Sequence, residues 1–234
     1  MGQAVTDCVK EDPATELGAC IDMGDSLAEA IELGDTVIDF TLPSFTRELM
    51  ERCVEKKKSI VMGTTGHDDT LLELIDAASQ TIPIVHAPNF SVGVNTLFWL
   101  TRKTTEILGH GFDLEVVEMH HRHKKDAPSG TARRLAEILA DARELSYEND
   151  VRHGRVGDVG ARTEDEIGMH SMRGGDVVGD HTVIYAADGE RVELTHKASS
   201  RYTFANGSVR AAKWIQANTI TSGLFDMQDV LGLK

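Results

Sequence analysis

The segment 118–131, EMHHRHKKDAPSGT, is the densest group of chemically capable side chains in the sequence. Six consecutive residues, from His120 to Lys125, are basic or titratable in a chain whose formal net charge is −14. Histidine and lysine can both donate protons near neutral pH when neighbouring groups tune them. The run therefore indicates a cationic site for an anion, and the alternative is a solvated charge run, which is common on protein surfaces.

The continuation of this segment favours the anion site. Pro128 fits the start of a helix, and Ser129, Gly130 and Thr131 follow it. The first backbone N–H groups of a helix lack partners and carry the positive end of its dipole, so they bind carboxylates and phosphates well. Beside Lys124, this helix start is suited to an acidic ligand. Taken alone, Ser-Gly-Thr is also what an ordinary N-cap looks like.

A metal site is the other interpretation of the histidines in this segment. His120, His121 and His123 would be the ligands. Adjacent side chains diverge in an extended segment, and no HExxH pattern is present. We therefore predict no metal.

Composition and charge exclude several classes of partner. The 234 residues include 38 acidic and 24 basic side chains, an excess that disfavours nucleic acid and anionic membranes. No apolar run approaches the ~18 residues of a membrane span, and the first residues lack a secretory signal pattern. Cys8, Cys20 and Cys53 form no CxxC pair and are expected to be reduced, buried thiols. We therefore expect a cytoplasmic protein.

Strand-like and helical patterns alternate in the first part of the chain. The expected order is strand 36–40, helix 44–57, strand 59–63, a helix that starts at Asp68 or Asp69, and strand 82–86. Short links between such elements predict parallel βαβ units in a doubly wound sheet. Ligands bind such sheets beyond the carboxyl ends of the strands. The loops 40–43, 63–66 and 87–90 are therefore candidates to hold a flat cofactor.

The pattern changes after Asn89. We expect helices near 94–108 and 131–143, strands near 167–172, 177–186 and 191–196, and a final helix over 206–222. Asp188 and Gly189 predict a hairpin turn, and the grouped strands predict an open, mostly antiparallel sheet. The polar, Gly-rich stretch 146–165 is expected to be a loop. In the segment 195–206, Arg201 could pair with an anion and Phe204 could pack on a ring, while a polar linker is an equally good interpretation.

Taken together, these motifs resemble the 4-hydroxy-tetrahydrodipicolinate reductase family, also called dihydrodipicolinate reductase. The matching blocks are VIDFT (37–41), GTTG (63–66), APNFSVGVN (87–95), EMHHRHKKDAPSGTA (118–132), RGGDVVGDHTV (173–183) and THKASSRYTFANGSVRAA (195–212). They span nearly the whole chain from residue 37, and the block at 118–132 is highly specific. Another Rossmann oxidoreductase, such as an amino-acid dehydrogenase, would not account for that block.

The resemblance implies an α/β fold with a Rossmann-like parallel sheet and an α+β domain with an open mixed sheet. It implies a dinucleotide-binding domain at 1–91 and 203–234 and a domain for substrate binding and oligomerisation at 92–202. The implied reaction reduces 4-hydroxy-tetrahydrodipicolinate, a small cyclic dicarboxylate, to tetrahydrodipicolinate in lysine and diaminopimelate biosynthesis. The cofactor would be NADH or NADPH, and the protein a homotetramer.

The resemblance also implies roles for individual residues. His120 matches the acid/base residue and Lys124 the proton donor. The positions that match substrate contacts are His121, Lys124, Ser129, Gly130 and Thr131. The positions that match cofactor contacts are Gly2, Asp22, Gly63, Thr64, Thr65, Ala87, Pro88, Asn89, Phe90, Arg201 and Phe204.

The sequence as given departs from the family pattern at its start. The family begins with a strand and a GxxGxxG turn that holds the cofactor pyrophosphate, so we expect the sheet to lack its first strand and NAD(P)H to bind poorly. Gly2 is expected to end that turn, followed by a helix over 3–10, a strand over Leu17–Ile21 and Asp22 at the ribose. Met23 stands where some relatives carry Arg, which favours NADH. The alternative function is that of a shortened or non-catalytic oligomeric relative.

Overall fold

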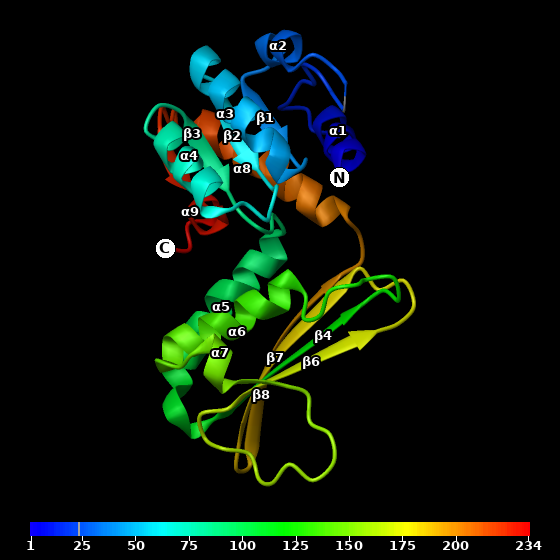
Figure 1. Cartoon of the computed structure of the whole chain (residues 1–234), viewed down its shortest axis with the longest axis vertical. Helices are drawn as coiled ribbons and strands as arrows, with labels where there is room; N and C mark the ends of the chain where they lie inside the picture. Colours follow the sequence, from blue (N-terminus) through cyan, green and yellow to red (C-terminus); the bar gives the residue numbers. More distant parts are fainter. Residues whose placement is uncertain (23) are drawn as a thin grey trace. The chain divides into compact units, whose positions relative to one another are not determined.

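A computed structural model describes residues 1–22 and 24–234 of the chain. The chain forms two compact units (Figure 1). Unit 1 comprises Met1–Val92 and Arg201–Lys234, and unit 2 comprises Gly93–Ser200. The chain therefore leaves unit 1 once, forms unit 2 and returns to complete unit 1.

Unit 1 is built on a four-stranded parallel sheet, which we call sheet A. Its strands are β1 (Thr36–Asp39), β2 (Ser59–Met62), β3 (Pro83–His86) and β9 (Gly223–Phe225), in the order β1-β2-β3-β9. The first three strands and their parallel pairing confirm the prediction from the sequence. The short strand β9 was not predicted, because three residues carry too little periodic pattern to be recognised.

Helices cover both faces of sheet A. On one face, Ile60, Met62 and Ile84 pack against α3 (Pro43–Lys56) and α4 (Asp69–Ser79). On the other face, Val61 and Val85 pack against α8 (Tyr202–Ala217) and α9 (Met227–Leu231). Burial on both faces explains why residues 60–62 of β2 and 83–85 of β3 are all apolar. Helix α8 ends at Ala217, so the helix predicted over 206–222 was too long at its C-terminal end.

The first helix, α1 (Gly2–Glu11), confirms the helix predicted over 3–10, and its Val5, Cys8 and Val9 pack against α8. The strand predicted over Leu17–Ile21 is wrong, because the segment is irregular and pairs with no strand in the part of the chain that the structure describes. It runs instead beside the turn after η1 (Ile31–Leu33), which follows α2 (Leu27–Ala30). A Cβ at Gly18 would lie 2.3 Å from the Leu33 carbonyl oxygen, so the backbones touch there.

Unit 2 is built on a five-stranded mixed sheet, which we call sheet B. Its order is β5-β6-β4-β7-β8, with β4 (Asp113–His120), β5 (Val151–His153), β6 (Ile167–Arg173), β7 (Gly179–Ala187) and β8 (Glu190–Ala198). The pairs β5–β6 and β6–β4 are parallel, so the expectation of a mostly antiparallel sheet was wrong for half of it. The predicted hairpin is confirmed between β7 and β8, where Gly189 has a φ of 86°.

One face of sheet B carries the helices of unit 2, as Figure 1 shows. These helices are α5 (Val92–Leu108), which continues into η2 (Gly109–Gly111), α6 (Gly130–Arg143) and α7 (Tyr147–Asp150). Both α7 and β5 lie in the stretch 146–165, so the prediction of a continuous loop was wrong there. The core between helices and sheet includes Leu114, Val116, Leu135 and Tyr185.

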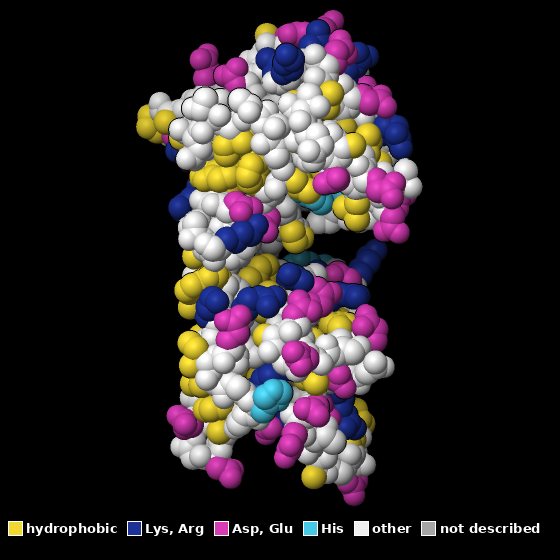
Figure 2. Space-filling view, turned by 90° about the vertical axis from the view of Figure 1, so that its left-hand side faces the viewer, with side chains coloured by type: hydrophobic (Ala, Val, Ile, Leu, Met, Phe, Trp, Pro, Cys, Tyr) yellow, Lys and Arg dark blue, Asp and Glu magenta, His cyan; other side chains and the backbone are white. Residues whose placement is uncertain are grey.

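On the face in Figure 2, acidic and basic side chains are interspersed on both units. In the described parts of the chain, no helix combines the length and the apolar character needed to cross a bilayer. Cys8 and Cys53 are buried as predicted, whereas Cys20 is exposed, which corrects the expectation that all three thiols are buried.

Candidate active site

The helix-covered face of sheet B changes from apolar to polar along β4. Side chains two positions apart share a face of a strand, so Leu114, Val116, Glu118 and His120 all point the same way. The first two belong to the core, whereas the last two bring a carboxyl and an imidazole into the same layer. Glu118 is fully buried, and His120 is 9% exposed. Polar side chains buried this deeply need partners within the layer.

The neighbouring strands supply these partners through the register of sheet B. Arg173 of β6 stands opposite His120, and His181 of β7 stands opposite Glu118. Paired residues of adjacent strands lie on the same face, so four polar side chains meet at one end of the sheet. We call Glu118, His120, Arg173 and His181 the polar cluster.

Glu118 is the centre of the polar cluster. Its carboxylate accepts two hydrogen bonds from the Arg173 guanidinium, both 2.8 Å long, and one from Nδ1 of His120 at 2.6 Å. A fourth comes from the backbone N–H of Ser129 at 3.2 Å. Burial raises the pKa of Glu118, but the bonds from Arg173 and His120 more than offset this, and the pKa lies below its ordinary value. Glu118 is therefore a carboxylate.

His120 is held with one ring nitrogen toward Glu118. A carboxylate can only accept, so Nδ1 of His120 carries the proton in this bond and Nε2 remains for other chemistry. Burial lowers the pKa of His120 below its ordinary value, and the bond to Glu118 opposes this without cancelling it. A Cβ at Gly179 would lie 3.0 Å from Nε2, so glycine leaves space beside the nitrogen. This geometry suits a general acid or base.

Helix α6 begins beside the polar cluster. Ser129 is its N-cap, and its Oγ accepts a hydrogen bond from the backbone N–H of Ala132 at 3.2 Å. The same Oγ lies 3.0 Å from Nε2 of His181. Gly130 is exposed, and Thr131 is partly exposed. The predicted helix start is confirmed, and it places the positive end of the helix dipole next to the buried imidazoles.

Lys124 adds a cation to this end of unit 2. Its side chain is 20% exposed, and Nζ donates to a carboxylate oxygen of Asp126 at 2.9 Å. The bond from Lys124 lowers the pKa of Asp126. His121 is partly exposed and stacks obliquely on His123, with ring centroids 6.3 Å apart. Across the described residues, no three acidic, His or Cys side chains gather as metal ligands would.

The loops at the carboxyl ends of β1 and β2 form a separate buried network in unit 1. Thr64 is 3% exposed, and its hydroxyl donates to Asp39 at 2.7 Å. The backbone N–H of Thr41 donates to Oγ1 of Thr64 at 2.9 Å, and the Thr41 hydroxyl donates to Asp39 at 2.6 Å. Thr64 therefore ties two loops together, while Thr65 is exposed beyond it.

Close packing shapes the loops of unit 1. A Cβ at Gly63 would lie 2.2 Å from the Phe40 ring, which packs edge-on against Phe90 with centroids 5.8 Å apart. A Cβ at Gly207 of α8 would lie 1.7 Å from the Phe90 carbonyl oxygen, so the helix backbone lies directly against this loop. Small, tightly fixed loops at the carboxyl ends of adjacent parallel strands fit a dinucleotide that lies across them.

The remaining cofactor candidates of unit 1 take several environments. Ala87 and Phe90 are buried, Asn89 is partly exposed and Pro88 is exposed. Gly2 is the first residue of α1, and Asp22 is exposed in a turn with Asp25. Arg201 is the exposed N-cap of α8, and Phe204 in its first turn is partly exposed. Met23, on which the preference for NADH was based, lies outside the described residues.

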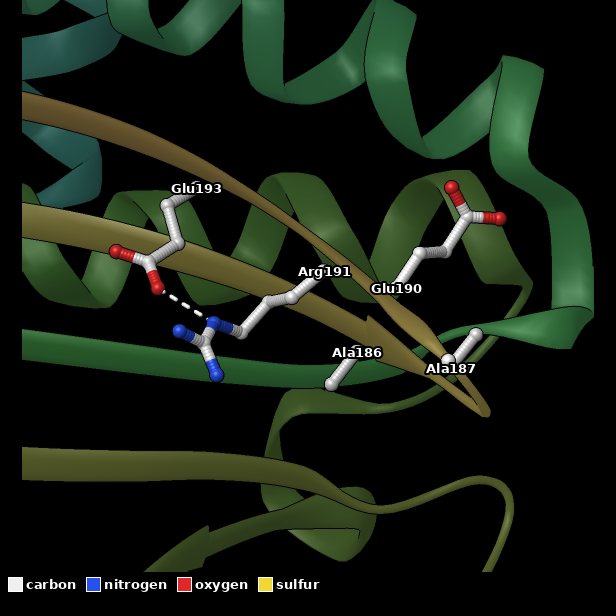
Figure 3. Close-up of a pocket in the computed structure, with 6 residues that line it drawn as sticks. Ala186, Ala187, Glu190, Arg191 and Glu193 are labelled. Carbon is white, nitrogen blue, oxygen red and sulfur yellow. Dashed lines mark hydrogen bonds and ion pairs between the residues drawn. The ribbon is translucent and has the colours of Figure 1, made fainter.

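A hollow beside the β7–β8 hairpin is not where the predicted residues gather. Figure 3 shows Arg191 and Glu193 joined by a hydrogen bond of 2.6 Å, with Glu190, Ala186 and Ala187 nearby. The described residues that line this hollow include none of those predicted from the sequence to contact substrate or cofactor.

Comparison with known proteins decides the family. The family described as "Dihydrodipicolinate reductase, N-terminus" matches residues 1–90, and "Dihydrodipicolinate reductase, C-terminus" matches residues 93–231. The chain belongs to the dihydrodipicolinate reductase family.

Individual relatives agree with this assignment. A 4-hydroxy-tetrahydrodipicolinate reductase of Akkermansia muciniphila is 58% identical over 234 residues, which cover all of this chain and 94% of the relative. A 4-hydroxy-tetrahydrodipicolinate reductase of Chromobacterium violaceum is 46% identical, and the match covers all of this chain and 95% of the relative. A dipicolinate-bound dihydrodipicolinate reductase of Paenisporosarcina sp. TG-14 has the same fold, with a TM-score of 0.73 and 24% sequence identity. The match covers 97% of this chain and 94% of the solved structure.

Membership of the dihydrodipicolinate reductase family makes the chain an oxidoreductase that uses NADH or NADPH. The α/β fold, with a parallel Rossmann-like sheet and a second mixed sheet, is confirmed. The alternative of a non-catalytic relative is not favoured, because proteins named as the reductase match the whole chain. The expectation that these 234 residues bind NAD(P)H poorly stays a prediction, which calorimetric titration of NADH tests.

The polar cluster contains residues that sequence reasoning did not single out. Glu118 opens the 118–131 segment but received no role, and Arg173 and His181 lie in a matched block without an assigned function. Glu118 and His120 are two positions apart in a strand whose alternate residues are apolar. This spacing was the sequence signal that the two side chains lie on the same face of the strand. Arg173 and His181 are 55 and 52 residues from their partners, so only the strand register joins them.

Proposed function

We propose that unit 2 binds 4-hydroxy-tetrahydrodipicolinate between the polar cluster and the start of α6, and that the chain reduces it to tetrahydrodipicolinate. The observation that supports this most is the buried Glu118–His120 pair, joined by a 2.6 Å hydrogen bond, beside a helix N-terminus capped by Ser129. The first supplies acid–base chemistry and the second binds a carboxylate. The Paenisporosarcina relative, which is dipicolinate-bound, has the same fold.

The two carboxylates of the substrate require positive charge and N–H or O–H donors. At the start of α6, Ser129, Gly130 and Thr131 would provide backbone N–H groups and hydroxyls for one carboxylate. The ammonium group of Lys124 and the ring of His121 would face the substrate from the preceding segment. Lys124 is paired with Asp126, which is 64% exposed on its side chain. A bound carboxylate can take the place of that exposed partner at little cost, because exposed ion pairs contribute about 0–1 kcal/mol.

The reaction adds a hydride to the ring and removes the 4-hydroxyl group as water, which requires one proton. When bound, the nicotinamide supplies the hydride. Lys124 would donate the proton, since its ammonium group carries three N–H donors. His120 would act as acid and base through Nε2, because Glu118 holds its Nδ1 and thus fixes the ring and its tautomer.

The cofactor would be held by unit 1, and the domain at 1–91 and 203–234 is proposed to be the dinucleotide-binding domain. The loops with Gly63, Thr64 and Thr65 and with Ala87 to Phe90 would lie against it, together with Arg201 and Phe204. Gly2 and Asp22 would approach the pyrophosphate and the ribose. The buried network of Asp39, Thr41 and Thr64 supports this role by fixing the loop backbones.

The cellular setting of the enzyme is part of the proposal. We propose a cytoplasmic homotetramer that assembles through the domain at 92–202. The place in lysine and diaminopimelate biosynthesis follows from the reaction. The sedimentation coefficient of the purified protein tests the tetramer, and a coefficient that fits a monomer at micromolar concentration would contradict it.

Steady-state kinetics of paired lysine variants test the proposed site. Lys124→Met is expected to lower kcat about 10²–10⁴-fold, since it removes a positioned acid. The matched control Lys125→Met changes the adjacent exposed lysine and is expected to retain kcat. NADH affinity, measured by fluorescence, should be the same in both. Equal activities of the two variants would refute the assignment of Lys124.

A further inference from the structure

His181 is a buried imidazole that has no role in the proposed reaction. It is 4% exposed, and its Nε2 lies 3.0 Å from Oγ of Ser129. Its ring also packs edge-on against His120, with centroids 5.1 Å apart. Its Nδ1 is buried and makes no hydrogen bond with any described residue. The two nitrogens of one ring therefore have very different surroundings.

These surroundings determine which nitrogen carries the proton. Burial lowers the pKa of His181 to about 3, so the ring is neutral at pH 7 and has a single N–H. If that N–H were on Nδ1, a buried donor would lack an acceptor, which is rare in folded proteins. If the N–H is on Nε2, it donates to Oγ of Ser129, and the only unmatched group of the ring is the lone pair of Nδ1. The second tautomer costs less, so Nε2 donates to Ser129.

This tautomer decides where the hydroxyl proton of Ser129 points. A hydroxyl has two acceptor positions and one donor. On Ser129, one acceptor position receives the backbone N–H of Ala132 and the other receives Nε2 of His181. Because both acceptor positions are filled from within unit 2, the O–H is left to donate elsewhere. With the opposite tautomer, the O–H would instead be consumed by His181.

We propose that His181 is a positioning residue that holds the Ser129 hydroxyl as a donor toward a carboxylate of the substrate. This inference rests on the proposed function, because it takes the start of α6 as the carboxylate site. A hydrogen bond to a charged acceptor contributes more than one between neutral groups, and losing the orientation of such a donor is expected to weaken binding about tenfold.

Two substitutions at position 181 separate a hydrogen-bonding role from simple filling of space. His181→Gln retains an N–H donor at the end of a side chain of similar reach, whereas His181→Leu fills the space without one. We expect His181→Leu to raise KM for the substrate and Kd for dipicolinate about tenfold, with kcat changed less than KM. His181→Gln is expected to restore both constants to within about threefold of the wild type.

Coupling to Ser129 gives the sharper readout. In a Ser129→Ala background, His181→Leu is expected to cause no further rise in Kd for dipicolinate, because the hydroxyl that it orients is already absent. His196→Leu is the matched control, since His196 stands opposite His181 on β8 and also has a buried, unpaired Nδ1. Among the described residues, the ring that contacts the Ser129 hydroxyl is that of His181 and not that of His196. That variant is expected to leave Kd unchanged.

The outcomes distinguish this inference from the proposed function. Equal losses for His181→Leu and His181→Gln, or losses that add to that of Ser129→Ala, would overturn the role of His181 and leave the carboxylate site intact. An unchanged Kd in Ser129→Ala would contradict the carboxylate site itself. If His181→Leu does not fold, ¹⁵N NMR of the wild-type imidazole decides the tautomer, and a proton on Nδ1 instead of Nε2 would overturn the inference.

Discussion

Replacement of His181 by glutamine is expected to make unit 2 less sensitive to acid. In the folded chain, burial holds the pKa of His181 at about 3, against 6.5 for the free side chain. Between these pH values the unfolded chain binds a proton at this position and the folded chain does not. The stability that neutral His181 contributes is therefore fully present above pH 6.5 and is lost as the pH falls toward 3.

The size of the effect follows from the two pKa values. At pH 4.5, two units below the unfolded pKa, the unfolded state gains about 3 kcal/mol relative to its free energy at neutral pH. This corresponds to about a 100-fold rise in the opening equilibrium of unit 2. Glutamine does not titrate, so the His181→Gln variant should lack this part of the loss. Groups with shifted pKa values that do not contact His181 act in both proteins and cancel in the difference.

Hydrogen exchange of the β7 amides measures this difference within unit 2. Opening free energies at pH 7.5 and 4.5, corrected for intrinsic exchange rates, are compared between the wild type and His181→Gln. The control His110→Gln changes an exposed histidine of η2 and should keep the wild-type loss. Identical losses in the wild type and His181→Gln would refute the conclusion that His181 is buried as a neutral ring.

Three further predictions concern the polar cluster and the loops of unit 1. Glu118→Gln is expected to lower kcat at least about 10²-fold, because the amide no longer fixes the tautomer of its histidine partner; stopped-flow NADH oxidation measures this. Gly207→Ala is expected to lower the melting temperature by several degrees because its Cβ would meet a backbone carbonyl oxygen, whereas Gly34→Ala, which makes only an ordinary contact, should not. Thr64→Val should cost about 1–3 kcal/mol in urea unfolding, since a buried Asp39 oxygen loses its donor.

Much of unit 1 could be predicted because its signals are local. The strands β1 to β3 are short apolar runs between turn residues, and α3 and α4 have one apolar face each. Asp68 caps α4 through a hydrogen bond to the Leu71 N–H, as its position before the helix suggested. The strand over Leu17–Ile21 failed because a strand also needs a neighbour for its backbone groups, which the local pattern does not contain.

Unit 2 was predicted less completely because its sheet depends on distant pairings. The parallel pairing of β6 with β4 joins segments about fifty residues apart, for example Leu114 with Ile167. Residues 151–153 form β5 only because β6 lies beside them. For the same reason, the sequence pointed to His120, Lys124 and Ser129, which lie close together in one motif, as candidate site residues. It did not single out Arg173 and His181, which join the polar cluster through the strand register.

The buried charge of Glu118 explains why His120 and the start of α6 are held together. A carboxylate has about four acceptor positions, and in this structure all are used: two by Arg173, one by His120 and one by the backbone of Ser129. Removal of any donor leaves part of a desolvated charge unmatched, which costs far more than an exposed ion pair. The carboxylate therefore fixes the imidazole on β4 relative to the helix end that would bind the substrate. Because His120 and Arg173 both donate to the same carboxylate, the effects of substituting them on the free energy of unfolding should be strongly non-additive.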